Sequence, residues 1–312
     1  MASRNFTGGE KLKTIIESYC SDEINRGVRH ELVFLSVLNA IFSVTAFLGN
    51  TLILAALQKE TSLHPPSKLL YRNLALTDLF VGIIAEPAKV AHWISAVGER
   101  WTVCYFTERT AFICSYMFCA VSLLTMTAIS VDRLLALLLG LKYRQVVTFK
   151  RTCAFLILFW GYSIVGISIY SSNLLIQKWY TYTTLFVCFV TVTVCYTLIF
   201  FTLRHNQIHI HGHTLQEQPS QATPLNIARY KKAVSSALWV TATLTVCYFP
   251  YATVVVLTPS KGMSAAIYRA RQLTITFVYF NSTLNPLLYC WRMKEVRKAI
   301  KDTLKHLCCS SV

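Results

Sequence analysis

The chain has 312 residues, of which 54% are hydrophobic and 14% charged, and its formal net charge is +16. This apolar content exceeds what one soluble core normally hides, so the composition favours a polytopic membrane protein. The charged residues lie in short segments between apolar runs, and the absence of a soluble basic domain argues against nucleic-acid binding.

Seven apolar runs are long enough to cross a hydrocarbon layer as helices, which takes about 20 residues each. They cover residues 32–57, 69–91, 111–141, 153–176, 179–203, 233–257 and 273–291. We therefore predict an all-α fold, a seven-transmembrane helix bundle in residues 31–290. Residues 1–30 form an extracellular N-terminal arm without a cleavable secretory signal, and residues 291–312 form an amphipathic helix and cytoplasmic tail.

The distribution of basic residues predicts the orientation. Most of the 30 Lys and Arg residues fall on the cytoplasmic side if the N-terminus is extracellular and the C-terminus cytoplasmic. We expect a multi-pass plasma-membrane protein whose basic inner face attracts anionic membrane lipid.

One connection, residues 205–228, is long and polar, and we expect it to be a loop. Its histidines could form a metal tract, but no Cys, Asp or Glu lies among them, so a solvated loop is the favoured interpretation. They are His205, His209, His211 and His213.

Asp78 is the one acid in the middle of an apolar run, and an acid at that depth needs a partner in the bundle interior. The polar residues available to it are Asn50, Ser122, Asn281 and Asn285.

The last run contains the segment NSTLNPLLYC, in which Asn281, Asn285 and Tyr289 recur every fourth residue and share one helix face. Pro286 lacks an amide donor and frees the carbonyl of Ser282, which predicts a kink below that polar stripe.

The tail has apolar residues at three- and four-residue steps from Met293 to Leu307, which predicts an amphipathic helix in the membrane surface. Cys308 and Cys309 at its end are palmitoylation candidates, or else unmodified thiols. The sequon at Asn5 lies in the arm and is a glycosylation candidate, whereas the same string at Asn281 is buried in the last run.

Eight short motifs, in chain order, carry a family resemblance. They are Gly49-Asn50, LHPPSKLL, NLALTD, SVDRL, Trp160, Tyr196, CYFP and NPLLY. Together they resemble the rhodopsin-like (class A) family of G protein-coupled receptors.

The resemblance implies a receptor that converts binding of an extracellular ligand into G-protein activation through outward movement of the sixth helix. A heterotrimeric G protein is the implied partner, with arrestin and receptor kinases as further ones. Arg133 would pair with Asp132 at rest and be freed on activation. The implied switch residues are Asp132, Arg133, Tyr196, Tyr248, Pro250, Asn285, Pro286 and Tyr289.

The resemblance also implies an allosteric sodium ion and no organic cofactor. The implied sodium ligands are Asp78, Ser122, Asn281 and Asn285. The alternative is an Asp78 that is protonated or merely hydrogen-bonded.

Several family restraints are altered. Leu134 replaces the usual tyrosine after Arg133, Tyr248 replaces a tryptophan, Cys188 replaces a proline, and Tyr230 stands where an acid would lock Arg133. We therefore expect measurable basal activity.

The usual cysteine of the third helix is replaced by Glu108, and the second outer loop has no cysteine. Cys20 and Cys104 are the available extracellular pair, so we predict a disulfide between them, with free thiols as the alternative. That outer loop, around residues 174–178, is very short, a trait resembling the melanocortin and related lipid-receptor branch.

The resemblance limits the ligand class. Amine receptors have an aspartate where Ser115 stands and opsins a lysine where Tyr279 stands, so we expect a peptide, a lipid or another small molecule. Polar and aromatic residues of the outer half form the predicted pocket, although each could instead serve helix packing. They are Glu86, Lys89, His92, Glu108, Arg109, Ser115, Tyr116, Cys119, Tyr251, Ile275 and Tyr279.

Other functional classes are considered beside the receptor. A small transporter or channel would also have polar residues at mid-membrane, and a decoy or partner receptor could keep the fold without coupling. The segment HELVF at residues 30–34 lacks the second histidine of a zinc site, so we expect no enzyme activity.

Overall fold

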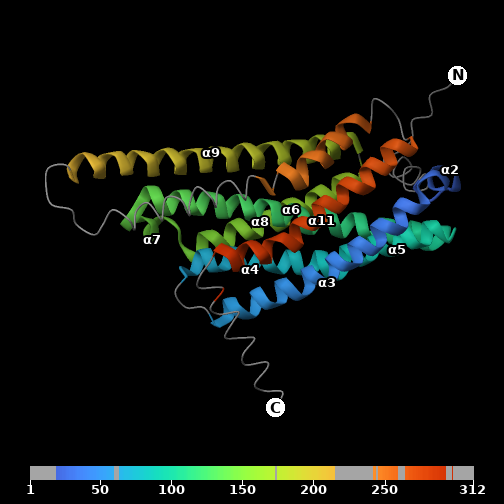
Figure 1. The fold of residues 1–312 in the computed structure, drawn as a ribbon, viewed down its shortest axis with the longest axis horizontal. Helices are drawn as coiled ribbons and strands as arrows, with labels where there is room; N and C mark the ends of the chain where they lie inside the picture. Colours follow the sequence, from blue (N-terminus) through green and yellow to red (C-terminus); the bar gives the residue numbers. More distant parts are fainter. Residues whose placement is uncertain are drawn as a thin grey trace, which may run out of the picture.

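The computed structural model describes residues 19–59, 63–172, 174–214, 242–243, 245–258, 264–292 and residue 297. These parts are almost entirely helical, and the long helices lie side by side along the long axis of the molecule (Figure 1). The prediction of an all-α helix bundle is confirmed.

The described elements follow one another with short connections. In order they are α2 (Asp22–Asn25), η1 (Arg26–Val28), α3 (Arg29–Lys59), α4 (Pro65–Phe80), η2 (Val81–Ala85), α5 (Glu86–Val97), α6 (Trp101–Leu139), η3 (Gly140–Lys142), α7 (Tyr143–Val146), α8 (Phe149–Ser172), α9 (Leu174–Thr214), an unlabelled helix (Thr245–Thr258) and α11 (Ala265–Arg292).

Four helical stretches in the described part of the chain are long and apolar enough to cross a membrane. They are Asp22–Lys59, Trp101–Val146, Phe149–Ile169 and Ile176–His205, and the apolar helix Thr245–Thr258 is shorter. Phe34, Ile157 and Phe186 point outward with 65%, 72% and 70% of their surface exposed. Apolar residues outside and polar residues inside suit a bundle surrounded by lipid.

Two predicted boundaries are wrong. Residues 174–178 were expected to form a loop, but they begin α9, because LLIQK contains no residue that ends a helix. Residues 205–214 were also expected in a loop and instead complete α9, so His209, His211 and His213 lie on a helix. The next proline along the chain is Pro219.

Several predicted features lie outside the described residues. They are the glycosylation candidate Asn5, the start of the sixth apolar run with Tyr230, and the tail beyond residue 292 with Cys308 and Cys309.

A π-helical turn, η2, joins α4 to α5 in one continuous rod. Pro87 follows directly and has no amide hydrogen to donate to the preceding turn, which favours the wider turn there. The extra residue rotates the face that α5 presents to the bundle. This rotation places Lys89 and His92 inside.

Helix α6 is the central element and packs against α4, α5, α8 and α9, while α11 packs against α3. The α3–α11 contact is close at Gly49, where a Cβ atom would lie only 2.9 Å from the Cβ and Cγ atoms of Pro286. Glycine therefore allows the proline-containing segment of α11 to approach α3.

Candidate functional site

Asp78 is completely buried and joins three helices. Its Oδ1 atom accepts hydrogen bonds from Ser122 Oγ of α6 at 3.0 Å and from Ser282 Oγ of α11 at 2.9 Å. Its Oδ2 atom accepts one from Asn285 Nδ2 at 2.6 Å. Ser122 and Asn285 lie where the sequence places them, whereas the contact of Ser282 was not predicted.

Asn50 does not contact Asp78 through any hydrogen bond described in the structure. Its Nδ2 atom instead donates to the Ser282 carbonyl at 3.1 Å. That carbonyl is the one that Pro286 leaves without a helical donor, so Asn50 supplies the missing hydrogen bond across the helix pair. The sequence correctly placed Asn50 in the bundle interior, but the kink explains its partner.

Asn281 points toward the sixth helix. Its Nδ2 atom lies 3.5 Å from the hydroxyl oxygen of Tyr248 and 3.8 Å from the sulfur of Met126. Its Oδ1 atom is buried and has no hydrogen-bond partner among the described residues.

This cluster has the chemistry of a cation site. It combines the Asp78 carboxylate, the hydroxyl oxygens of Ser122 and Ser282, and the unpartnered amide oxygen of Asn281. Hard cations take such oxygen ligands. The residues present therefore fit sodium.

At the opposite end of α6, Asp132 is buried and Arg133 is half exposed. Asp132 accepts hydrogen bonds from Ser67 Oγ at 2.9 Å and from the Tyr143 hydroxyl at 2.6 Å. The Arg133 guanidinium lies 3.9 Å from Asp132 Oδ2, donates to the Tyr71 hydroxyl at 3.0 Å, and lies over the Tyr71 ring.

The other switch residues occupy the same half of the bundle or the sixth helix. Ser130 Oγ donates to the Tyr196 hydroxyl at 3.4 Å, which places Tyr196 one turn before Arg133. Pro250 lies in helix Thr245–Thr258. Tyr289 lies in α11, but its side chain is outside the described residues.

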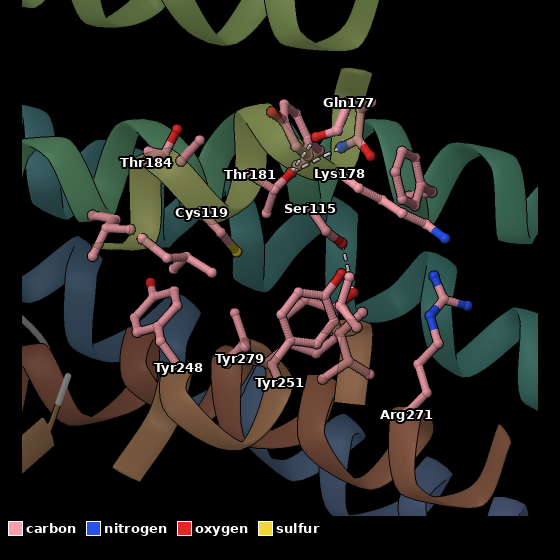
Figure 2. A pocket seen from close by; sticks show the side chains of 18 of the residues that line it. Ser115, Cys119, Gln177, Lys178, Thr181, Thr184, Tyr248, Tyr251, Arg271 and Tyr279 are labelled. Atoms are coloured by element: carbon pink, nitrogen blue, oxygen red, sulfur yellow. Dashed lines mark hydrogen bonds between the residues drawn. The ribbon is translucent and has the colours of Figure 1, made fainter. Parts of the chain in front are cut away.

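A cavity of about 380 Å³ opens between α6, α9, helix Thr245–Thr258 and α11. Figure 2 shows Tyr248, Tyr251 and Tyr279 on one side, with Ser115 and Cys119 of α6 beside them. Ser115 Oγ is 2.6 Å from the Tyr279 hydroxyl oxygen. The predicted pocket residues that line the cavity are Ser115, Tyr116, Cys119, Tyr251, Ile275 and Tyr279.

Five predicted pocket residues do not line the cavity. Lys89, His92 and Glu108 form a buried cluster, in which Glu108 Oε2 is 2.6 Å from Lys89 Nζ and 3.5 Å from His92 Nε2. Glu86 is buried without a hydrogen-bond partner among the described residues, and Arg109 is exposed. Periodicity predicts that such residues are in the outer half, but it does not fix how far each helix is rotated.

The cavity also has lining residues that the sequence did not predict. Tyr19, Gln177, Lys178 and Thr181 come from segments treated as arm or loop, and Arg271 precedes the apolar run that marks the seventh helix. A signal was present for Arg271, which is followed by Ile275 and Tyr279 at four-residue steps on one helix face.

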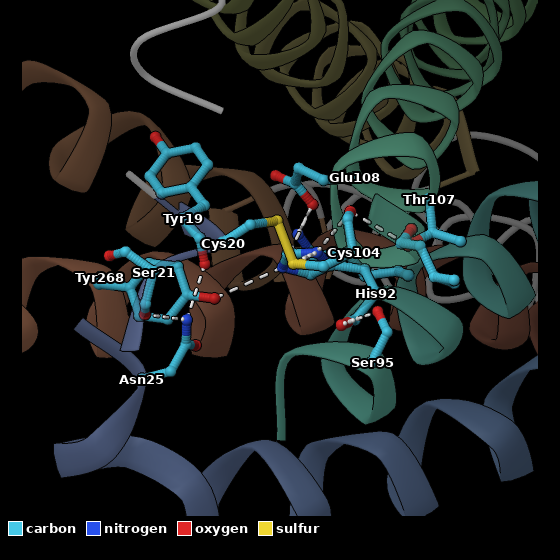
Figure 3. The surroundings of a disulfide bond; sticks show 12 residues. Tyr19, Cys20, Ser21, Asn25, His92, Ser95, Cys104, Thr107, Glu108 and Tyr268 are labelled. Carbon is cyan, nitrogen blue, oxygen red and sulfur yellow. Dashed lines mark hydrogen bonds and ion pairs between the residues drawn. A yellow bond between two sulfur atoms is a disulfide. The ribbon is translucent and has the colours of Figure 1, made fainter. Parts of the chain in front are cut away.

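The segment before α3 is fixed to the outer end of the bundle by a disulfide between Cys20 and Cys104, as predicted. Figure 3 shows this bond between Tyr19, His92 and Glu108. Asn25 Nδ2 donates to the carbonyls of Tyr19 and Ser21 at 2.8 and 2.7 Å, and the Tyr19 ring packs on Tyr268 with centroids 5.6 Å apart. The short segment therefore covers part of the cavity.

The family described as 7 transmembrane receptor (rhodopsin family) matches residues 49–191 and 168–289. The matched regions begin at the Gly49-Asn50 motif and end at Tyr289, and they contain the Asp78 cluster, the Asp132–Arg133 pair and most of the cavity wall. A multi-pass membrane protein and a G-protein partner follow in general terms from this match. The chain belongs to the rhodopsin family of seven-transmembrane receptors.

Proposed function

We propose that this receptor binds an extracellular ligand in the cavity of Figure 2 and converts that binding into G-protein activation by outward movement of the sixth helix. The observation that carries the proposal is the position of Tyr248. Its side chain lines the cavity, and its hydroxyl is 3.5 Å from Asn281, one turn before the Asp78 ligand Asn285. A ligand that moves Tyr248 therefore acts directly on the polar cluster of the bundle.

The inner end of α6 is the proposed output. Arg133 is held by Tyr71 and Asp132, and both lie on the α4–α6 side rather than on the sixth helix. Movement of the sixth helix therefore breaks no ion pair of Arg133 that is described in the structure. This weak restraint supports the expectation of measurable basal activity.

Sodium is the proposed allosteric ion. The Asp78 carboxylate, with Ser122, Asn281 and Asn285 beside it and Ser282 as an added ligand, would hold it. The ion supplies a positive charge at a buried acid. The described hydrogen bonds keep the helices α4, α6 and α11 together around that acid, which favours the resting packing.

The finer features of the receptor are also proposals. We infer a plasma-membrane receptor with an extracellular N-terminus, coupled to a heterotrimeric G protein and regulated by arrestin and receptor kinases. The absence of a long segment between α8 and α9 supports the likeness to the melanocortin and lipid-receptor branch. The second candidate is a decoy or partner receptor that does not couple, which the altered residues Leu134 and Tyr248 favour.

Basal G-protein activation in transfected cells, measured with a panel of G proteins, tests the proposal. Wild type and Arg133→Ala are compared at matched surface expression, with Lys150→Ala as a control cation exposed on the same inner face. We expect a basal signal that Arg133→Ala abolishes and Lys150→Ala keeps. A signal equal to mock-transfected cells for all three would favour the non-coupling receptor.

A further inference from the structure

The cavity has two chemically different ends. Toward the bundle centre its wall is formed by apolar and aromatic side chains, including Cys119, Leu123 and Val278. At the other end stand two cations, Lys178 from α9 and Arg271 from α11. Figure 2 shows their charged groups facing each other across the cavity.

The charges at this end are not balanced among the described residues. Glu108 is the carboxylate that approaches Arg271, with 3.7 Å between Oε1 and Nη1, and it also binds Lys89 at 2.6 Å. Three cations, Lys89, Lys178 and Arg271, therefore meet one acid. Glu86, one turn before Lys89, forms no ion pair with these cations in the described part of the chain.

Burial makes this imbalance costly. The side chains of Lys89 and Arg271 are only 2% and 11% exposed. A charge withdrawn from water needs a partner of opposite sign, and one carboxylate cannot fully serve two such cations. An incoming anion would complete the set, and a guanidinium suits carboxylates and phosphates because it donates two parallel hydrogen bonds.

The same wall disfavours cationic ligands. None of the described residues that line the cavity is an aspartate or glutamate. The cavity volume of about 380 Å³ lies within the range of roughly 300–1,000 Å³ typical of small-molecule sites. Its entrance is narrowed by Tyr19, whose ring lies 4.5 Å below the Arg271 guanidinium.

We propose that the ligand is an anionic amphiphile, with a carboxylate or phosphate held between Arg271 and Lys178 and an apolar body that extends to Cys119 and Tyr248. This inference rests on the proposed function, because it names the ligand class of the same cavity. Arg271 acts as the specificity residue and Lys178 strengthens the field at the entrance.

Direct binding to the full-length receptor in lipid nanodiscs tests the ligand class without using signalling as a readout. The probes share a ten-carbon chain and differ in the head group: decanoic acid, decyl phosphate, decan-1-ol and decylamine, each measured against empty nanodiscs. Decanoic acid and decyl phosphate distinguish a carboxylate from a phosphate source. We expect at least one of the two anions to bind saturably and at least tenfold more tightly than the alcohol and the amine.

Variants locate the binding. Arg271→Gln should weaken anion binding at least tenfold and Lys178→Gln several-fold, while alcohol binding stays unchanged. Arg109→Gln is the matched control, because Arg109 is exposed beside Glu108 and does not line the cavity. If Arg271→Gln fails to fold, Arg271→Lys keeps the charge and should still weaken the anion by removing the paired hydrogen bonds.

Three results would overturn the ligand class: no saturable anion binding, equal or tighter binding of the alcohol or amine, or anion affinities that the Lys178 and Arg271 variants leave at the level of Arg109→Gln. Anion binding without activation of any G protein would instead contradict the proposed function and leave the ligand class intact. The two failures are therefore distinguishable.

Discussion

Asp78 connects helices that are distant in the sequence. Its two carboxylate oxygens take hydrogen bonds from α6 and α11, so the bundle centre is held together by polar contacts rather than by apolar packing alone. Polar groups inside a bundle are costly unless they are fully paired, and they mark functional positions. At the residue scale, this cluster is where ligand binding and helix movement meet.

Substitution of Asp78 by Asn tests the cation assignment. The amide has nearly the same shape but no charge, so sodium loses its principal ligand. We expect sodium chloride to raise the unfolding temperature of the wild type above that in choline chloride, by about 2–4 °C for each kcal/mol of binding. The Asp78→Asn variant should unfold at the same temperature in both salts.

The control is Thr45→Ala, which removes a hydroxyl from the exposed side of α3. It should keep the sodium dependence of the wild type. A sodium effect that persists in Asp78→Asn would show that the ion acts elsewhere.

The sequence predicted the centre of this cluster better than its surroundings. Asp78 and Asn285 stand out because acids and amides are rare in apolar runs. Ser282 does not stand out, because serine is common in membrane helices, and its role depends on the rotation of α11 around Pro286. Lys89 and Glu108 were placed at the correct depth, but the π turn before α5 decides that they face each other.

At the scale of elements, the contact between α3 and α11 depends on Gly49. A methyl group at this position would lie 2.9 Å from two atoms of Pro286, whose ring cannot rotate away. We expect Gly49→Ala to destabilise the receptor by about 1–3 kcal/mol through overpacking. Thermal unfolding in detergent or nanodiscs measures this change.

Gly161→Ala in α8 is the matched control. A Cβ atom there meets no other atom within 4 Å, so alanine should be neutral or slightly stabilising because it favours the helix. Equal stability of the Gly49 and Gly161 variants would contradict the close contact of α3 with α11.

The disulfide attaches the segment before α3 to the start of α6. Its loss frees a loop of 84 residues, so Cys20→Ser should lower the stability by about 2–4 kcal/mol. Cys104→Ser and the double variant should have the same effect, since each breaks the same bond. Thermal unfolding with and without reductant gives the measurement, and Cys114→Ser, which removes a free cysteine, is the control.

Alkylation separates this account from the alternative of free thiols. In the native, non-reduced receptor, neither Cys20 nor Cys104 should react. Labelling of both would contradict the disulfide.

Element positions were largely predictable, whereas their ends were not. Hydropathy located α3, α6, α8 and α9, because apolar length is the signal that a membrane imposes. It placed the turn between α8 and α9 several residues too late, since Gln177 and Lys178 read as loop residues but form the first turns of α9. Those two polar residues serve the cavity, which explains why they interrupt the apolar pattern.

At the scale of the whole molecule, the basic residues predict the orientation in the membrane. An epitope tag placed before residue 1 should be detected on intact cells, and a tag after residue 312 only after permeabilisation. The reverse staining pattern would place the cavity on the cytoplasmic side and contradict its role as an extracellular ligand site.

The central claim is that this bundle transmits a signal from the outer cavity to a G protein. Nucleotide exchange on purified heterotrimeric G proteins, with the receptor in lipid nanodiscs and no ligand added, tests it most directly. The account predicts exchange faster than with empty nanodiscs for at least one G protein, and loss of that excess in Arg133→Ala. Exchange equal to that of empty nanodiscs for every G protein would contradict it.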